Sequence, residues 1–169
     1  KMNKKPLVSV IIAHHNGRNL IKGCLDSLFK IDYPKDRLEI IVVDNCSEDN
    51  SVRFVKRNYP RVKLIKNNVN NYCKACNLGI ATSKSAYVVL LNNDVEVRKN
   101  WLSELVKVIE KDKSIGAVTS KLIGKDGTIQ NAGHFELPNF YWDERGAGKE
   151  AKAYNVRSEV DSISGACVL

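Results

Sequence analysis

Three clusters of polar residues follow apolar runs of the sequence, and they contain the side chains best suited to chemistry. The clusters are His14-His15-Asn16, Asp44-Asn45 and Asn92-Asn93-Asp94. Asp94 could hold Mg²⁺ or Mn²⁺, because Mg²⁺ typically takes only one or two protein carboxylates and completes its shell with phosphate oxygens. Asp44 could accept a hydrogen bond from the imide N–H of a base. Either carboxylate could instead cap the helix that follows it.

Other patterns carry weaker chemical signals. Cys73 and Cys76 form a single C-x-x-C pair, whereas zinc or redox chemistry needs a second ligand pair or a thioredoxin-like setting. His14 and His15 are adjacent, so on a strand they point to opposite faces and do not easily share one metal. Residues 146–151 match G-x-G-x-x-A by letter, but no strand precedes them. The absence of a Walker A loop and of a G-x-S-x-G elbow excludes P-loop NTPases and α/β-hydrolases.

The elements that must position the polar clusters alternate along the chain. Apolar runs predict strands over residues 7–13, 38–43, 62–65, 87–91 and 115–119. Helical spacing predicts helices around residues 20–31, 52–56, 75–81 and 101–109, and Ser47 or Asn50 can cap the second of them. This order predicts an α/β fold with a mostly parallel sheet and helices on both faces. Ligands bind such sheets beyond the carboxyl ends of the strands, so the three clusters should meet at one edge.

The pattern changes after about residue 120 to a mixed β region. Asp126-Gly127 is a turn signal between short β-like pieces at residues 122–123 and 128–129. Residues 136–156 are irregular, and residues 160–169 again read as a strand. The chain stops on the apolar pair Val168-Leu169, which predicts a fragment cut inside an element.

Composition places the chain among ordinary globular domains. It has 169 residues, of which 43% are hydrophobic and 27% charged, and this suits one domain with one sizeable core. With 27 Lys and Arg against 19 Asp and Glu, the net charge is +8, which fits a phosphate-bearing partner or simply a basic solvated surface. No apolar run approaches the roughly 18 to 20 residues that cross a bilayer. The odd number of cysteines predicts reduced thiols in a cytoplasmic protein.

Taken together, the motifs resemble those of family 2 glycosyltransferases. The residues that carry the likeness are 8–12 with Asn16-Gly17, 41–45 with Ser47 and Asp49, 77–80 and 90–94. Further matches resemble the rhamnosyltransferase-like branch and are Trp101-Leu102, 116–118, 130–133, Val160-Asp161 and 164–166. The likeness covers nearly the whole chain, and the ordered set is more specific than any one motif.

The resemblance implies a GT-A fold, a single α/β domain that binds a nucleoside-diphosphate sugar. Residues 1–119 would form the nucleotide-sugar-binding half, and residues 120–169 would begin the acceptor-side half. Ala13, His14 and Asn16 would line the base and ribose pocket, Asp44 would read the base, and Asn92-Asn93-Asp94 would stand for the D-x-D motif. The residues expected to bind the donor are Ala13, His14, Asn16, Asp44, Asn45, Lys74, Asn77, Asn92 and Asn93, and Asp94 is expected to bind a divalent metal, Mn²⁺ or Mg²⁺.

The implied reaction is transfer of the sugar with inversion, by direct displacement at the anomeric carbon. The acceptor would be a polysaccharide, a lipid-linked saccharide or a protein, and a basic enzyme could work on it at the inner face of the membrane. Where the family often has tyrosine this chain has His15, and residues 70–76 lack the usual glycines. The catalytic base is expected beyond Leu169, with Asp161 as the only nearby substitute.

Two other function classes compete with this interpretation. A sugar-nucleotide pyrophosphorylase shares the α/β layout but would need a glycine-rich basic loop after the first strand, where only Gly17 and Arg18 stand. A nucleic-acid-binding module would gather Lys and Arg with aromatic residues on one face. The basic residues here are spread along the chain, so no nucleic-acid partner is expected.

Overall fold

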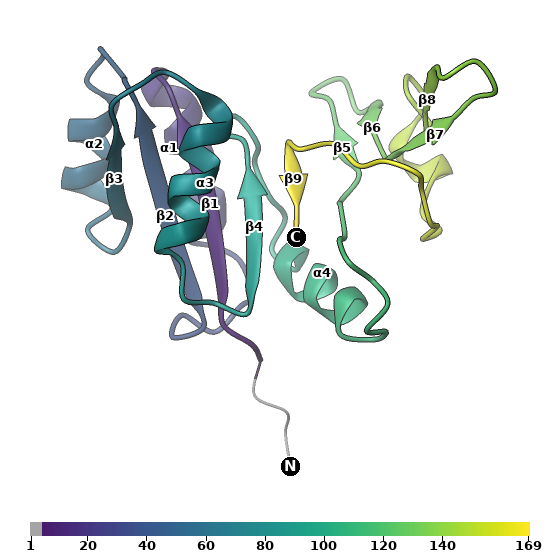
Figure 1. Cartoon of the computed structure of the whole chain (residues 1–169), viewed down its shortest axis with the longest axis horizontal. Coiled ribbons are helices and arrows are strands. Elements are labelled where there is room, and N and C mark those ends of the chain that lie inside the picture. Colours follow the sequence, from purple (N-terminus) through teal and green to yellow (C-terminus); the bar gives the residue numbers. More distant parts are fainter. Residues whose placement is uncertain (1–4) are drawn as a thin grey trace.

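A computed structural model describes residues 5–169 and shows a mixed sheet flanked by helices (Figure 1). The main sheet has the order β3-β2-β1-β4-β9, in which β1 to β4 are parallel and β9 is antiparallel to β4. Its strands are β1 (Val8–His14), β2 (Leu38–Asn45), β3 (Lys63–Asn67), β4 (Tyr87–Leu91) and β9 (Cys167–Val168). The helices are α1 (Arg18–Leu28), α2 (Ser51–Asn58), α3 (Tyr72–Thr82) and α4 (Trp101–Ile109). The parallel α/β fold predicted from the sequence is confirmed.

Successive side chains of β1 point to opposite faces of the sheet, and nearly all of them are buried. Both faces are therefore apolar, and helices cover each of them. Val10 and Ile12 pack into a large cluster with α1, α2 and α4, whereas Ile11 packs into a smaller one with Ala75 of α3. Helix α3 lies very close to the strands. A β-carbon on Gly79 would stand 2.4 Å from Cγ2 of Ile11, so only glycine allows this approach.

The register of the parallel strands aligns the polar clusters. His14 is paired with Asp44, and Asn45 with Asn67, at the last positions of their ladders. Strand β4 ends at Leu91, so Asn92-Asn93-Asp94 leaves the sheet at the same edge. The convergence expected from chain order is therefore present in the structure.

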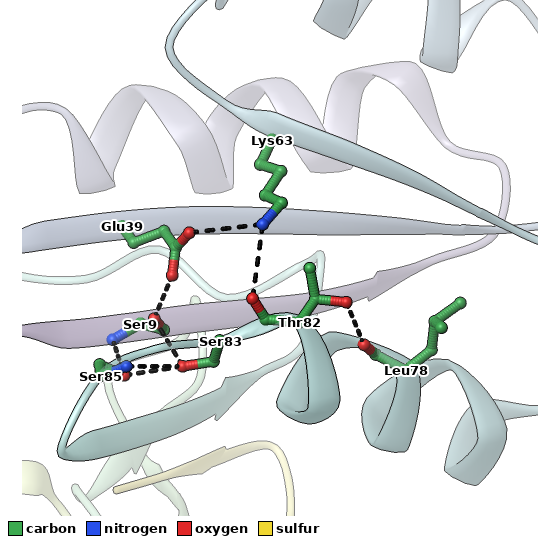
Figure 2. A network of polar contacts seen from close by, with 7 residues as sticks. All are labelled: Ser9, Glu39, Lys63, Leu78, Thr82, Ser83 and Ser85. Carbon is green, nitrogen blue, oxygen red and sulfur yellow. Dashed lines mark hydrogen bonds and ion pairs between the residues drawn. The ribbon is translucent and has the colours of Figure 1, made fainter.

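At the opposite ends of the parallel strands, where β1, β2 and β3 begin, a network of hydrogen bonds joins neighbouring elements (Figure 2). The Ser9 hydroxyl donates to Glu39 at 2.5 Å, and the Ser83 hydroxyl donates to the Ser9 oxygen at 2.9 Å. Lys63 lies 3.8 Å from the Glu39 carboxylate and donates to the carbonyl oxygen of Thr82 at 3.4 Å. These contacts join the starts of β1, β2 and β3 to the end of α3, far along the strands from the polar clusters.

The fifth strand predicted over residues 115–119 is wrong. Residues 115–118 are irregular, and Thr119 forms only an isolated bridge with Val168. Strand β9 is the neighbour of β4 in the sheet instead, with Leu90 paired with Val168. Val118 exchanges backbone hydrogen bonds with Leu169, the residue that follows β9. The strand predicted over residues 160–169 is correspondingly reduced to Cys167–Val168.

The mixed β region after about residue 120 is confirmed. Strands β5 (Leu122–Ile123) and β6 (Ile129–Asn131) pair across the predicted Asp126-Gly127 turn. A second antiparallel pair consists of β7 (His134–Glu136) and β8 (Trp142–Glu144), followed by a short 3₁₀ helix, η1 (Ala151–Ala153). Within residues 5–169, no helix combines the length and apolar composition needed to cross a membrane.

Candidate functional site

The loops after β1 and β2 are fastened to each other. Asn16 adopts a left-handed conformation, φ 53°, and its side-chain oxygen accepts hydrogen bonds from the backbone N–H of Glu48 and Asp49. In return, the Asp49 carboxylate accepts from the backbone N–H of Gly17 at 2.8 Å and of Ser51 at 3.0 Å. The hydroxyl of Ser51 also donates to Asp49. These hydrogen bonds, that of the Ser51 hydroxyl first, lower the pKa of Asp49 to about 2.

The predicted side-chain cap of α2 differs from the observed one. Asn50 occupies the N-cap position, but its side chain makes no capping hydrogen bond, and Ser47 instead donates its backbone N–H to Asp44 at 2.9 Å. Asp49 accepts from the first N–H of the helix. The Asp-x-Ser spacing is the turn signal that could have identified this arrangement from the sequence.

His14 is completely buried beneath these loops. Its Nε2 lies 2.7 Å from the Ser51 hydroxyl oxygen, and its Nδ1 lies 2.9 Å from Nδ2 of Asn93. Burial lowers the pKa of His14, which keeps the ring neutral at pH 7. His15 follows the last residue of β1 and is exposed. Its Nδ1 lies 2.9 Å from the carbonyl oxygen of Asn45.

The second cluster connects to the loop after β3. The Asn45 side-chain oxygen accepts from Nδ2 of Asn67 at 2.9 Å and from the backbone N–H of Asn71 at 3.0 Å, and its Nδ2 donates to Asn70 at 2.9 Å. The amide of Asn45 is thus used to shape the segment that leads into α3. Asn67 was missed by the sequence reasoning, although the asparagine-rich run after the third predicted strand was a usable signal.

A hollow beside Asp44 opens between α2 and β3. Its volume is about 410 Å³, and Val52, Lys56, Leu64 and Lys66 are among the residues that line it. Asp44 is the only predicted site residue on its wall. The other predicted site residues do not line it.

The third cluster places a free carboxylate at this edge. The Asn92 backbone N–H donates to the carbonyl oxygen of Ala166 at 2.9 Å, and its side-chain oxygen accepts from the Tyr72 hydroxyl at 3.2 Å. Asp94 is exposed, and no hydrogen bond or ion pair joins its carboxylate to any other side chain of residues 5–169. A single free carboxylate fits a divalent cation that also binds phosphate oxygens, since Mg²⁺ needs only one or two protein carboxylates in such sites. Within the same residues, no group of three or more His, Cys, Asp or Glu side chains is arranged as a metal site.

The remaining predicted residues differ in exposure. Ala13 is half-buried against the α3-side core, and Lys74 and Asn77 are exposed on α3. The side chain of Asn71 caps α3 by accepting from the backbone N–H of Lys74 at 2.8 Å. Asp161, the substitute base, accepts from the backbone N–H of Glu136 at 3.0 Å.

A strand-end site on a parallel sheet is a feature that many proteins share, and comparison with known sequences identifies the family. The sequence model described as Glycosyl transferase family 2 matches residues 9–165. The chain belongs to glycosyl transferase family 2. It is 33% identical over 127 residues to the probable glycosyltransferase YdaM of Bacillus subtilis, covering 71% of this chain and 30% of that relative. The family predicted from the motifs is therefore confirmed.

Solved structures of glycosyltransferases share this fold. The mannosyltransferase PcManGT of Pyrobaculum calidifontis, in complex with GDP-Man and Mn²⁺, matches with a TM-score of 0.64 and 29% identity, covering 72% of this chain and 37% of that one. TarS 1-349 of S. aureus in complex with UDP-GlcNAc matches with a TM-score of 0.64 and 27% identity, covering 72% of this chain and 36% of that one. The GT-A fold is thus confirmed, and this family 2 chain spans little more than a third of the length of either structure.

Proposed function

We propose that the chain is the donor-binding part of an enzyme that transfers a sugar from a nucleoside-diphosphate sugar to an acceptor hydroxyl, with inversion and with the help of a divalent metal. The observation that carries the proposal is the free carboxylate of Asp94, at the edge where the three polar clusters meet in a family 2 chain. Residues 1–119 would form the donor-binding half, and residues 120–169 would begin the acceptor-side half. Nucleotide sugars in two structural neighbours support this choice of donor.

In the proposed reaction, the acceptor oxygen attacks the anomeric carbon as the bond to the diphosphate breaks. Asp94 would hold the metal, which supplies positive charge to offset the charge that builds on the leaving diphosphate. The exposed Lys74 would contact a phosphate, Asn77 on the same helix and Asn92 would contact the donor, and Asp44, beside the hollow between α2 and β3, would read the base. The acceptor's proton must pass to a base within about 3 Å of its hydroxyl, and this base is expected beyond Leu169.

The acceptor in this proposal is a saccharide or a lipid-linked saccharide. A net charge of +8 favours approach to an anionic membrane surface, where juxtamembrane basic residues each contribute about 1 kcal/mol. Work at the inner face of the membrane is therefore part of the proposal.

Asp94→Ala tests the metal-assisted donor site. Titration calorimetry of UDP, dTDP and GDP, each with and without Mn²⁺, should find one nucleotide that binds wild type in a metal-dependent way. The substitution should weaken that binding about tenfold or more and remove its dependence on Mn²⁺, because the sole protein carboxylate of the proposed site is lost.

Glu96→Ala is the matched control, since it removes the same charge from an exposed residue only two positions away. It should leave the affinity within about twofold of wild type. An equal loss in both variants would reduce the effect to general electrostatics. Metal-independent binding that survives Asp94→Ala would contradict the assigned role.

A further inference from the structure

The buried ring of His14 joins two loops of the site without reaching its surface. One ring nitrogen faces Ser51, behind the loop that follows β2, and the other faces Asn93, in the loop that follows β4. Because His14 has no exposed surface, its side chain does not face a ligand at the carboxyl ends of the strands. It can act on such a ligand only through the groups that it contacts, and of these Asn93 lies directly before Asp94.

The hydrogen positions in the contacts from Asp49 through Ser51 and His14 to Asn93 follow from the number of hydrogen-bond donors that each group has. The ionised Asp49 can only accept, so the single hydroxyl hydrogen of Ser51 is directed to it. The Ser51 oxygen must then accept from His14, which places the ring proton on Nε2. A neutral imidazole carries one proton, so Nδ1 of His14 is an acceptor and requires a donor on Asn93.

This requirement fixes the orientation of the Asn93 amide. Its Nδ2 donates to Nδ1 of His14 at 2.9 Å and to the carbonyl oxygen of Asn16 at 3.5 Å. The side-chain oxygen has no hydrogen bond within residues 5–169, and it is not among the buried polar atoms that lack a partner there. It is therefore presented to solvent, one residue before Asp94. A flipped amide would set an oxygen against the lone pair of Nδ1.

We propose that His14 is a positioning residue, which holds the Asn93 oxygen outward so that it accepts a hydrogen bond from a hydroxyl of the bound donor. This inference rests on the proposed function, because it requires a nucleotide sugar at the edge. An amide NH₂ in the same place could not accept that hydrogen. The hydrogen bonds that run from Asp49 to Asn93 thus determine that the site presents an amide oxygen to its ligand, not an amide NH₂.

The tautomer of His14 tests the first half of the inference without any ligand. The chain has three histidines, so ¹⁵N spectra of the histidine-labelled whole protein can be assigned readily. At pH 7, Nε2 of His14 should resonate as a protonated nitrogen and Nδ1 as an unprotonated one. Ser51→Ala removes the acceptor for Nε2 and should give a mixture of tautomers. A wild-type ring protonated on Nδ1 would overturn the assignment, whatever the protein binds.

Donor affinity tests the second half. With Mg²⁺ present, Ser51→Ala should weaken binding about three- to tenfold, the equivalent of one neutral hydrogen bond. UDP and GDP carry only ribose hydroxyls, whereas UDP-GlcNAc and GDP-mannose add those of the sugar. A loss seen with the diphosphates assigns the hydroxyl to the ribose, and a loss seen only with the nucleotide sugars assigns it to the transferred sugar.

A double-mutant cycle separates positioning from general loosening of the loops. In an Asn93→Ala background, Ser51→Ala should have no further effect on affinity, because the group through which it acts is gone. Ser83→Ala is the matched control, a serine hydrogen-bonded to a buried serine at the opposite edge of the sheet (Figure 2). It should leave both the tautomer and the affinity unchanged.

The outcomes distinguish this inference from the proposed function. Unchanged affinity in Ser51→Ala, despite mixed tautomers, would overturn the positioning role, and so would additive losses in the cycle. If wild type binds none of the four nucleotides, the proposed function fails and the donor contact of Asn93 fails with it. The wild-type tautomer would still decide how the amide is held, even if Ser51→Ala did not fold.

Discussion

At the scale of single residues, Asp49 and Asn16 join two loops of the site by side-chain hydrogen bonds. Asp49 is exposed along the chain, yet its two oxygens accept hydrogen bonds from Gly17 and Ser51, and so join the loops after β1 and β2. Asn16 closes the same junction from the other side. The strand-end loops are therefore pre-organised before any ligand arrives.

Asp49 should make stability depend on pH in acid. Its pKa is lowered from 3.8 to about 2 by the hydrogen bonds that it accepts in the folded state. A lowered folded-state pKa gives a contribution that is complete above the unfolded pKa and is lost as pH falls through the folded one. Urea unfolding should therefore show stability falling between about pH 4 and pH 2, with a smaller fall in Asp49→Asn.

Glu48→Gln, at the neighbouring exposed position, is the control and should follow the wild-type profile. If the Asp49→Asn profile has the full wild-type slope, the carboxylate does not contribute in this way.

At the scale of elements, α3 packs very close to the sheet, and its start is hydrogen-bonded to the second polar cluster. Gly79 allows contact at a distance that no side chain permits, and Asn71 caps the helix at the edge that carries the polar clusters. Gly79→Ala would force α3 away from Ile11, at a cost of about 1–3 kcal/mol for overpacking. Denaturant unfolding should show this as a lower midpoint.

Gly116→Ala is the matched control, because a β-carbon there would meet no atom within 4 Å. An unchanged midpoint in Gly79→Ala would mean that the helix and strand adjust without cost.

The sequence predicted the elements wherever one local pattern decides them. Residues 101–109 show helical spacing and residues 87–91 are a short apolar run, and both predictions match the observed bounds. The strand at 115–119 failed because pairing of Leu90 with Val168 joins residues far apart in the chain. The strand-end clusters were predictable from parallel topology. The contact of His14 with Asn93 joins the end of β1 to the loop after β4, and no local pattern encodes it.

Across the whole molecule, the segment after residue 120 returns to support the loop that contains Asp94. Strand β9 enters the sheet beside β4, and just before it Ala166 accepts the backbone N–H of Asn92 at 2.9 Å (Figure 1). Tyr72 reinforces this junction from α3, since its hydroxyl lies 3.2 Å from the side-chain oxygen of Asn92 and 3.4 Å from the carbonyl oxygen of Gly165. The two parts of the chain therefore meet at the candidate metal ligand's own loop.

Tyr72→Phe should loosen that junction without disturbing the core. Tyr72 is 44% exposed, and its partial burial is the main cause that raises its pKa to about 12. Its hydroxyl therefore keeps its hydrogen and donates it at neutral pH. Loss of this hydroxyl should lower the free energy of unfolding by about 0.5–1.5 kcal/mol. It should also increase the hydrogen-exchange rate of the backbone N–H of Asn92. Tyr141→Phe, on a side chain 71% exposed, should change neither quantity. If Asn92 exchanges at the wild-type rate in Tyr72→Phe, β9 alone fixes the loop and the coupling between the two parts does not involve α3.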